Sequence, residues 1–429
     1  MTFPDLPGPL HRRGPRPLLL HLGLAMLRSS TSGTGWRNSK PGSPDWKAIV
    51  EQAGAIFARL AAQSATENPA ENHLADLAQR LGANLRQNSD LIAGIAAYRR
   101  HPWHRTLADP PTTWEEGGSR LLDYAQPGTI GPTVLFVPSL VNRATILDLS
   151  AEHSMLRFLA RNGVRPLLLD WGWPGPLERT FTLTDYVAGR LARAMEAAHQ
   201  LAGGPVVLAG YCMGGTLAVA AAQRQPDLLR GLALLATPWD FHAGDPEPAG
   251  TLARQLPLLE PLMALSAALP VDALQTLFTL LDPDGVAAKY RAFARLDPES
   301  DRARLFVALE DWLNDGVPLA APVARECLTN WYGANQPMRG AWHIAGAPID
   351  PRTLRLPCFI AAPARDRIVP PESARPLASL IRGAEVLQPA VGHIGMVAGS
   401  TAETVLWRPL LNWLRAIAIC PVRCSNRGF

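Results

Sequence analysis

The sequence has little of several features that would place a protein in a specialised class. Only 18% of its 429 residues are charged, its formal net charge is +4, and it has five cysteines. A weak and dispersed positive charge gives no basis for nucleic-acid binding. Scattered cysteines without a paired C-x-x-C spacing favour neither a zinc site nor a disulfide framework, and they are typical of a reducing cytoplasm. They are Cys212, Cys327, Cys358, Cys420 and Cys424, and the pattern assigns no role to the last two.

Long apolar runs are also lacking, and none reaches the length that a transmembrane helix needs. The run from Leu18 to Leu27 follows the basic stretch from His11 to Arg16, which is the order found in a secretory signal peptide. His21 inside the run, Arg28 directly after it and the lack of an A-x-A-like cleavage site argue against secretion. Apolar residues make up 47% of the chain, which favours a well-packed globular protein with one large core or two domains.

The pattern of residues changes several times along the chain. The first segment is rich in proline, glycine, serine and arginine, which predicts an irregular conformation. Apolar residues at helical spacing follow, and then short apolar runs alternate with helical patterns until a Leu-, Ala- and Pro-rich stretch interrupts them. We expect an irregular segment at 1–44, an N-terminal helical region at 45–112, an α/β core at 113–240 and 336–418, a helical cap at 241–335 and a tail at 419–429.

Seven short apolar runs predict the strands of the core. They lie at 119–124, 133–137, 164–169, 206–209, 232–235, 358–362 and 385–388. Strands that alternate with helices favour a mostly parallel central sheet with both faces covered. The predicted fold class is therefore α/β.

The most informative stretch is Gly210-Tyr211-Cys212-Met213-Gly214-Gly215, which joins a predicted strand to a helix-forming run. A G-x-C-x-G turn in this position is typical of a nucleophile elbow, where glycines on either side of the nucleophile let strand and helix approach closely. The alternative is a small buried thiol in an ordinary glycine-rich loop. We interpret Cys212 as the candidate nucleophile and Gly210, Gly214 and Gly215 as the elbow glycines.

A thiol nucleophile needs a base and a third group that orients the base. Asp366 and His393 each follow a predicted strand, at the sheet edge where the elbow is expected. With Cys212 they give the chain order nucleophile, acid, histidine that α/β-hydrolases use. The backbone N–H groups of Met213 and Val141 are the expected oxyanion hole, because one follows the nucleophile and the other lies in the loop after an early strand.

Together these motifs resemble those of the polyhydroxyalkanoate synthases, which polymerise 3-hydroxyacyl-CoA. Besides the cysteine elbow, the similar segments lie at 137–143, 146–149, 236–241, 311–315, 366–370 and 392–394. The resemblance implies an α/β-hydrolase fold in which Cys212 holds the growing acyl chain as a thioester. It also implies that His393 activates the thiol and that Asp366 helps to activate the incoming 3-hydroxyl.

Some positions depart from the pattern of that family. Arg367 stands where the family has histidine after the acid, and Ala398-Gly399-Ser400 stand in place of Asn-Pro-Pro. Ala144-Thr145 replace a Tyr-Tyr pair. These departures keep all three triad residues but leave the substrate range, and polymerisation itself, open.

Three functions are compatible with these residues. The first is a cytoplasmic acyltransferase of poly-3-hydroxybutyrate biosynthesis with no cofactor or metal, since CoA would arrive as part of the substrate. The second is a thioesterase, esterase or intracellular polyester depolymerase that uses the same triad with water. The third is an inactive protein that binds polyester granules. For the first we expect 3-hydroxyacyl-CoA as substrate, with a homodimer and a granule surface as further partners to test.

Overall fold

The computed structural model describes residue 12 and residues 14–31, 88–282 and 285–419. Their contacts divide them into two compact units. Unit 1 takes the described residues up to His104 together with Gln275–Asn314, and unit 2 takes Arg105–Leu274 and the residues from Asp315 onward.

Unit 2 is built on an eight-stranded sheet with the strand order β1-β2-β4-β3-β5-β6-β11-β12. Its strands are β1 (Thr112–Glu116), β2 (Ser119–Asp123), β3 (Thr133–Val137), β4 (Arg165–Asp170), β5 (Val206–Tyr211), β6 (Leu229–Leu235), β11 (Cys358–Ala361) and β12 (Glu385–Leu387). β2 pairs antiparallel with β1 and β4, and the remaining pairs are parallel. The predicted α/β class with a mostly parallel sheet is confirmed. All residues of β3, β5 and β11 are buried, as expected for continuous apolar strands covered on both faces.

All seven predicted strands are present, and their ends differ from the prediction by at most three residues. β1 was not predicted, because its sequence TTWEE is polar and largely exposed at the sheet edge. Four two-residue strands also lie outside the prediction, since such short strands leave no periodic signal. They are β7 (Ala268–Leu269) paired with β8 (Leu319–Ala320), and β9 (His343–Ile344) paired with β10 (Ala347–Pro348).

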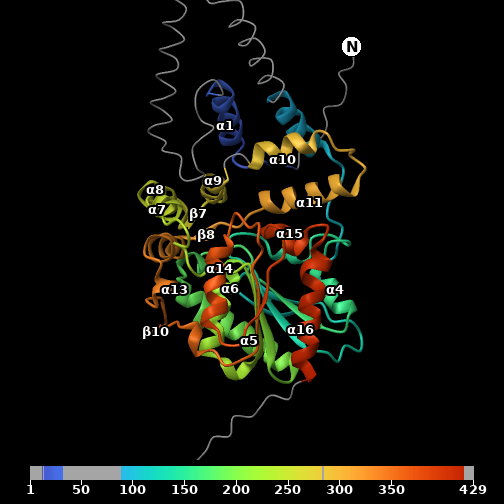
Figure 1. Ribbon diagram of the computed structural model, residues 1–429, viewed down its shortest axis with the longest axis vertical. Helices are drawn as coiled ribbons and strands as arrows, with labels where there is room; N and C mark the ends of the chain where they lie inside the picture. The colour runs from blue at the N-terminus through green and yellow to red at the C-terminus, as the bar shows by residue number, and fades with distance from the viewer. Residues whose placement is uncertain (1–11, 13, 32–87, 283–284, 420–429) are drawn as a thin grey trace, which may run out of the picture. The chain divides into compact units, whose positions relative to one another are not determined.

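Helices cover both faces of the sheet in unit 2. Figure 1 shows α4 and α16 on one face and α5 and α6 on the other. Phe359 of β11 packs against Trp413 of α16 with ring centroids 5.6 Å apart. The bounds of the helices outside the predicted cap are α4 (Met155–Arg161), α5 (Ala192–Ala202), α6 (Met213–Arg224), α14 (Pro371–Leu380), α15 (His393–Ala398) and α16 (Arg408–Ile419), with the short or π-type turns η2 (Ala144–Leu147), η3 (Glu178–Thr180), η4 (Asp185–Leu191), η5 (Pro226–Leu228), η7 (Pro351–Thr353) and η8 (Glu403–Trp407).

The interval predicted as a cap is mainly helical. Its elements are α7 (Glu247–Ala253), α8 (Leu256–Ser266), α9 (Val271–Leu281), α10 (Gly285–Phe293), α11 (Asp301–Asn314), α12 (Ala321–Glu326) and η6 (Cys327–Gly333), followed by α13 (Gln336–Arg339). Residues 275–314 belong to unit 1, so the interval is not one compact body. Whether it covers a site stays a prediction.

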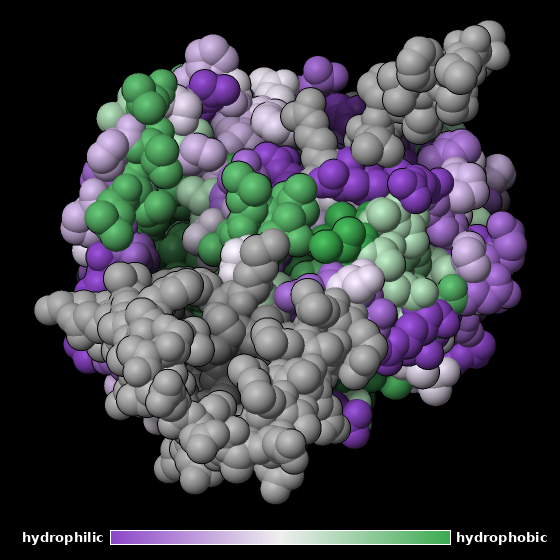
Figure 2. All heavy atoms as spheres, turned by 90° about the horizontal axis from the view of Figure 1, so that it is seen from above, coloured by the Kyte–Doolittle hydropathy of each residue, from purple (hydrophilic) through white to green (hydrophobic). Residues whose placement is uncertain are grey.

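Helix α8 carries an apolar stripe that is open to solvent. Leu258, Leu262 and Leu265 are 73%, 42% and 86% exposed, and their spacing places them on one side of the helix. Figure 2 shows hydrophobic residues gathered in groups between hydrophilic ones on the face that it displays. No helix of the described chain has the length and apolarity of a membrane span.

The described part of the N-terminal region departs from the prediction at one helix. Residues 1–44 were expected to be irregular, but Leu18–Thr31 form helix α1. That expectation was wrong because the proline and glycine content of the whole interval masked a leucine-rich run that can form a helix. Within the helical region predicted at 45–112, residues 88–100 are helical, and 45–87 lie outside the described residues.

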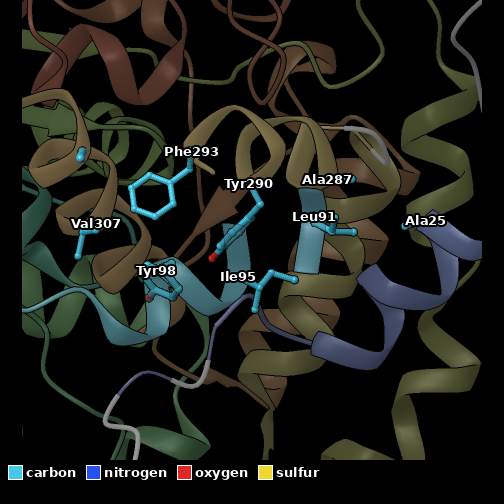
Figure 3. Packing of buried hydrophobic residues seen from close by; sticks show 9 residues of the cluster. Ala25, Leu91, Ile95, Tyr98, Ala287, Tyr290, Phe293 and Val307 are labelled. Carbon is cyan, nitrogen blue, oxygen red and sulfur yellow. The ribbon is translucent and has the colours of Figure 1, made fainter. Parts of the chain in front are cut away.

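Unit 1 has its own apolar core. Leu91, Ile95 and Tyr98 recur at helical spacing and contact Tyr290 and Phe293 of α10 (Figure 3). The Tyr98 and Tyr290 rings meet edge to face, with centroids 5.6 Å apart. The helix at 88–100, α10 and α11 are thus joined by aromatic packing, since Phe306 of α11 contacts both tyrosine rings.

A buried carboxylate fixes the loop after β3. The Asp148 side chain is fully buried and accepts hydrogen bonds from Arg157, Arg105 and Tyr124 at 2.8–3.0 Å. Asp148 ends η2, and η2 packs against α15, which begins at His393. The segment 146–149, one of those similar to the synthases, therefore ties this loop to the framework around the candidate site.

We expect Asp148→Asn to lower the free energy of unfolding by about 3 kcal/mol, because two arginines lose a buried counter-charge. Asp301→Asn is the control, since Asp301 is 96% exposed in its pair with Arg304 and should cost less than about 1 kcal/mol. Urea unfolding of both variants measures the difference. Equal losses would contradict a structural role for the buried carboxylate.

Candidate active site

The backbone at Cys212 has the conformation that a nucleophile elbow requires. Cys212 lies between β5 and α6 with φ 56° and ψ −130°, a region that residues with a side chain rarely adopt. Its N–H donates to the Leu235 carbonyl at 2.8 Å, and its own carbonyl accepts from Gly215 at 2.8 Å. Both bonds hold the turn, so the side chain is presented beyond the end of the strand.

The three elbow glycines are sterically required. A Cβ on Gly210 would lie 2.4 Å from the Cα of Gly215, and one on Gly214 would lie 2.1 Å from the carbonyl oxygen of Val137. A Cβ on Gly215 would meet the Thr237 hydroxyl at 1.9 Å. Strand and helix can approach this closely only without side chains at these positions.

The structure brings Asp366 and His393 together although 27 residues separate them in sequence. Nδ1 of His393 lies 2.6 Å from Oδ2 of Asp366, and both side chains are buried. The other carboxylate oxygen accepts the N–H groups of Ile368 and Val369 at 2.9 Å each. With Nδ1 engaged by the carboxylate, Nε2 is the ring nitrogen left to serve another group.

Cys212 is the group that His393 faces. Burial by itself lowers the pKa of His393, but the charge of Cys212, the hydrogen bonds with Asp366 and Cys212 and the charge of Asp366 outweigh it, so the pKa is raised above its usual 6.5. The half-buried Cys212 side chain also packs against Ala362, Val369 and Ala374. The arrangement can therefore pass a proton from the thiol to the imidazole beside an apolar wall.

The two expected oxyanion donors differ in their surroundings. Met213 is the first residue of α6, where the helix offers its N–H no acceptor within the helix. The N–H of Val141 donates to the hydroxyl of Ser139 at 3.3 Å, and the Val141 carbonyl accepts from Val317 at 3.1 Å. An acyl oxygen would have to displace the long Ser139 bond to use Val141. The oxyanion role of both residues stays a prediction.

An aromatic cluster lies along the loop that follows β6. Trp331 contacts Phe241 and Trp342, with ring centroids 5.5 Å and 5.4 Å apart, and Trp342 also contacts Trp239. Asn335 secures the loop, since its side chain accepts from the N–H of Phe241 and donates to Asp240. Burial raises the pKa of the Tyr332 phenol, and charge on Cys212 raises it further.

Comparison with known families assigns the fold. Residues 132–399 match the family model described as alpha/beta hydrolase fold, which covers more than half of the chain. The chain belongs to the α/β hydrolase family.

Several relatives of this α/β hydrolase carry one name. Proteins named poly(3-hydroxyalkanoate) polymerase subunit PhaC from Haloferax mediterranei and Haloarcula marismortui are 30% and 28% identical over 65% of the chain. A protein of the same name from Allochromatium vinosum is 26% identical over 66% of the chain and 80% of its own length. The chain spans 58% and 60% of the length of the Haloferax and Haloarcula proteins. The resemblance to polyhydroxyalkanoate synthases is thus confirmed at the level of sequence.

The sequence did not reveal every residue at the site of this α/β hydrolase. Tyr211 packs against His393, and Ser139 occupies the N–H of Val141. Tyr211 stands next to the candidate nucleophile Cys212, but its partner His393 lies 182 residues away, so no local pattern joins them. Among the described residues, no group of three or more His, Cys, Asp or Glu side chains is placed to hold a metal ion.

We expect Gly214→Ala to lower the free energy of unfolding by about 1–3 kcal/mol, because the new Cβ would strike the backbone oxygens of Val137 and Pro138. Gly204→Ala is the matched control, since nothing lies within 4 Å of a Cβ there. Denaturant midpoints of the two variants provide the measurement. An unchanged denaturant midpoint in Gly214→Ala would mean that the elbow is not close-packed.

We expect Cys212→Ala to lower the pKa of His393, because it removes the charge and the hydrogen bond of Cys212 while burial remains. The loss of a neighbouring opposite charge corresponds to about one to three pH units. NMR titration of the His393 ring in both proteins measures the shift. An unchanged titration would show that the thiol does not interact with the imidazole.

Proposed function

We propose that this chain is an acyltransferase of the polyhydroxyalkanoate synthase type that polymerises 3-hydroxyacyl-CoA. The observation that carries the proposal is a cysteine at a strained elbow beside a histidine that a buried carboxylate orients. The shared name of the relatives supports the substrate class. A cysteine nucleophile suits such a substrate, since transfer of the acyl group from the CoA thiol to the cysteine thiol keeps it activated as a thioester.

The first half of the reaction loads the enzyme. His393 takes the thiol proton of Cys212, and the sulfur attacks the thioester carbonyl of the substrate. The N–H groups of Met213 and Val141 would stabilise the oxyanion. CoA then leaves as a thiol with the proton that His393 returns, and the acyl group stays on Cys212 as a thioester.

The second half transfers the acyl group to a hydroxyl. The 3-hydroxyl of another unit loses its proton to His393 and attacks the thioester carbonyl. The ester forms as the acyl C–S bond breaks, and His393 returns the proton to the Cys212 sulfur. Asp366 has both oxygens engaged and a fully buried side chain. Its help to the hydroxyl therefore passes through His393 rather than through direct contact.

Exclusion of water separates this function from hydrolysis by the same triad. Ala362, Val369 and Ala374 give the thiol an apolar neighbourhood. A protected thioester waits for a hydroxyl, whereas an accessible one is hydrolysed. We also propose that the protein works in the cytoplasm, associates with itself and attaches to a granule surface.

The purified protein should release CoA from 3-hydroxybutyryl-CoA and form an insoluble polyester. Cys212→Ala should abolish CoA release, a loss of at least about 10³-fold, while thermal unfolding stays close to that of the parent protein. Free CoA and the acyl product are followed together. Free 3-hydroxy acid in place of polymer would support the hydrolase, and no release from acyl-CoAs of several lengths would support an inactive binding protein.

A further inference from the structure

Tyr211 is the last residue of β5 and directly precedes Cys212. Its side chain is 3% exposed, and burial together with the charges of Cys212 and Asp366 raises the pKa of its phenol well above the usual value. The phenol therefore stays protonated throughout the pH range in which an enzyme works. It is a neutral ring with a hydrogen to donate, placed beside the proposed catalytic groups.

The ring of Tyr211 lies against the imidazole of His393. The two centroids are 5.1 Å apart with an angle of 35° between the planes. The Tyr211 hydroxyl also donates to the backbone carbonyl of His393 at 3.4 Å, which is long for such a bond. The hydroxyl bond therefore contributes little to holding His393.

The ring contact completes the support of His393. Asp366 holds one edge of the imidazole through Nδ1, but a single hydrogen bond still allows the ring to swing about that edge. A side chain packed against the face of the ring restricts this motion. An aromatic face within about 6 Å also attracts a cation, so it favours the imidazolium over the neutral ring.

We propose that Tyr211 is a positioning residue that holds the His393 imidazole toward Cys212 and stabilises the imidazolium formed when the thiol proton moves to His393. The inference rests on the proposed function for its place in the reaction. The effect of Tyr211 on proton transfer between Cys212 and His393 can be measured without an acyl substrate.

The test compares Tyr211→Phe, which keeps the ring, with Tyr211→Leu and Tyr211→Met, which remove it. The rate of Cys212 alkylation by iodoacetamide at pH 7 is followed by peptide mass spectrometry. We expect Tyr211→Leu and Tyr211→Met to slow alkylation by about tenfold and to move the NMR titration of His393 to lower pH. Tyr211→Phe should stay within about twofold of the parent protein, because the long hydroxyl bond contributes little.

Tyr290→Leu is the matched control, since Tyr290 is a fully buried tyrosine with ring contacts in unit 1. It should lose stability without a change in Cys212 alkylation. Folded Tyr211→Leu or Tyr211→Met with parental alkylation and His393 titration would overturn the proposal. Equal slowing in Tyr211→Phe or in Tyr290→Leu would do the same.

Turnover distinguishes this inference from the proposed function. If the parent protein releases CoA, the two ring-deleting variants should lower kcat and leave KM within about twofold. If the parent protein releases none, the acyltransferase proposal fails, and the alkylation rates still decide whether Tyr211 supports His393.

Discussion

The strained backbone of Cys212 is the constraint on which the rest of the site depends. A residue with a side chain at φ 56° costs about 1–3 kcal/mol and persists only where its surroundings enforce it. Two short backbone hydrogen bonds and the close approach of Gly214 to the Val137 carbonyl provide that enforcement. The sulfur of Cys212 is therefore held at the carboxyl end of the central strand β5, where His393 can reach it.

Two buried carboxylates serve this arrangement in different ways. Asp366 orients His393 directly, with its second oxygen fixed by two backbone amides. Asp148 acts at a distance, since it anchors the turn that packs against α15. Asp311, from another motif shared with the synthases, binds Arg12 and Tyr98 within unit 1. Segments that the chain shares with the synthases can thus have a structural role, and the geometry distinguishes them from the candidate catalytic residues.

The sequence predicted the parallel sheet and the three candidate catalytic residues because both leave local signals. Buried strands are continuous apolar runs, and the elbow needs glycines at fixed offsets from Cys212. It could not predict β1, whose polar residues carry no apolar pattern, or helix α1, which prolines and glycines on both sides concealed. It also missed the contact of Tyr211 with His393, because that contact exists only after distant strands have been brought together.

The most direct test of the account is to trap the acyl group on the enzyme. The protein is mixed with 3-hydroxybutyryl-CoA, quenched in acid at early times, digested and mapped by mass spectrometry. We expect one 3-hydroxybutyryl group on the peptide that contains Cys212, and hydroxylamine should release it as it releases a thioester. Release of CoA without this adduct at any early time, or an adduct on another residue alone, would contradict the account.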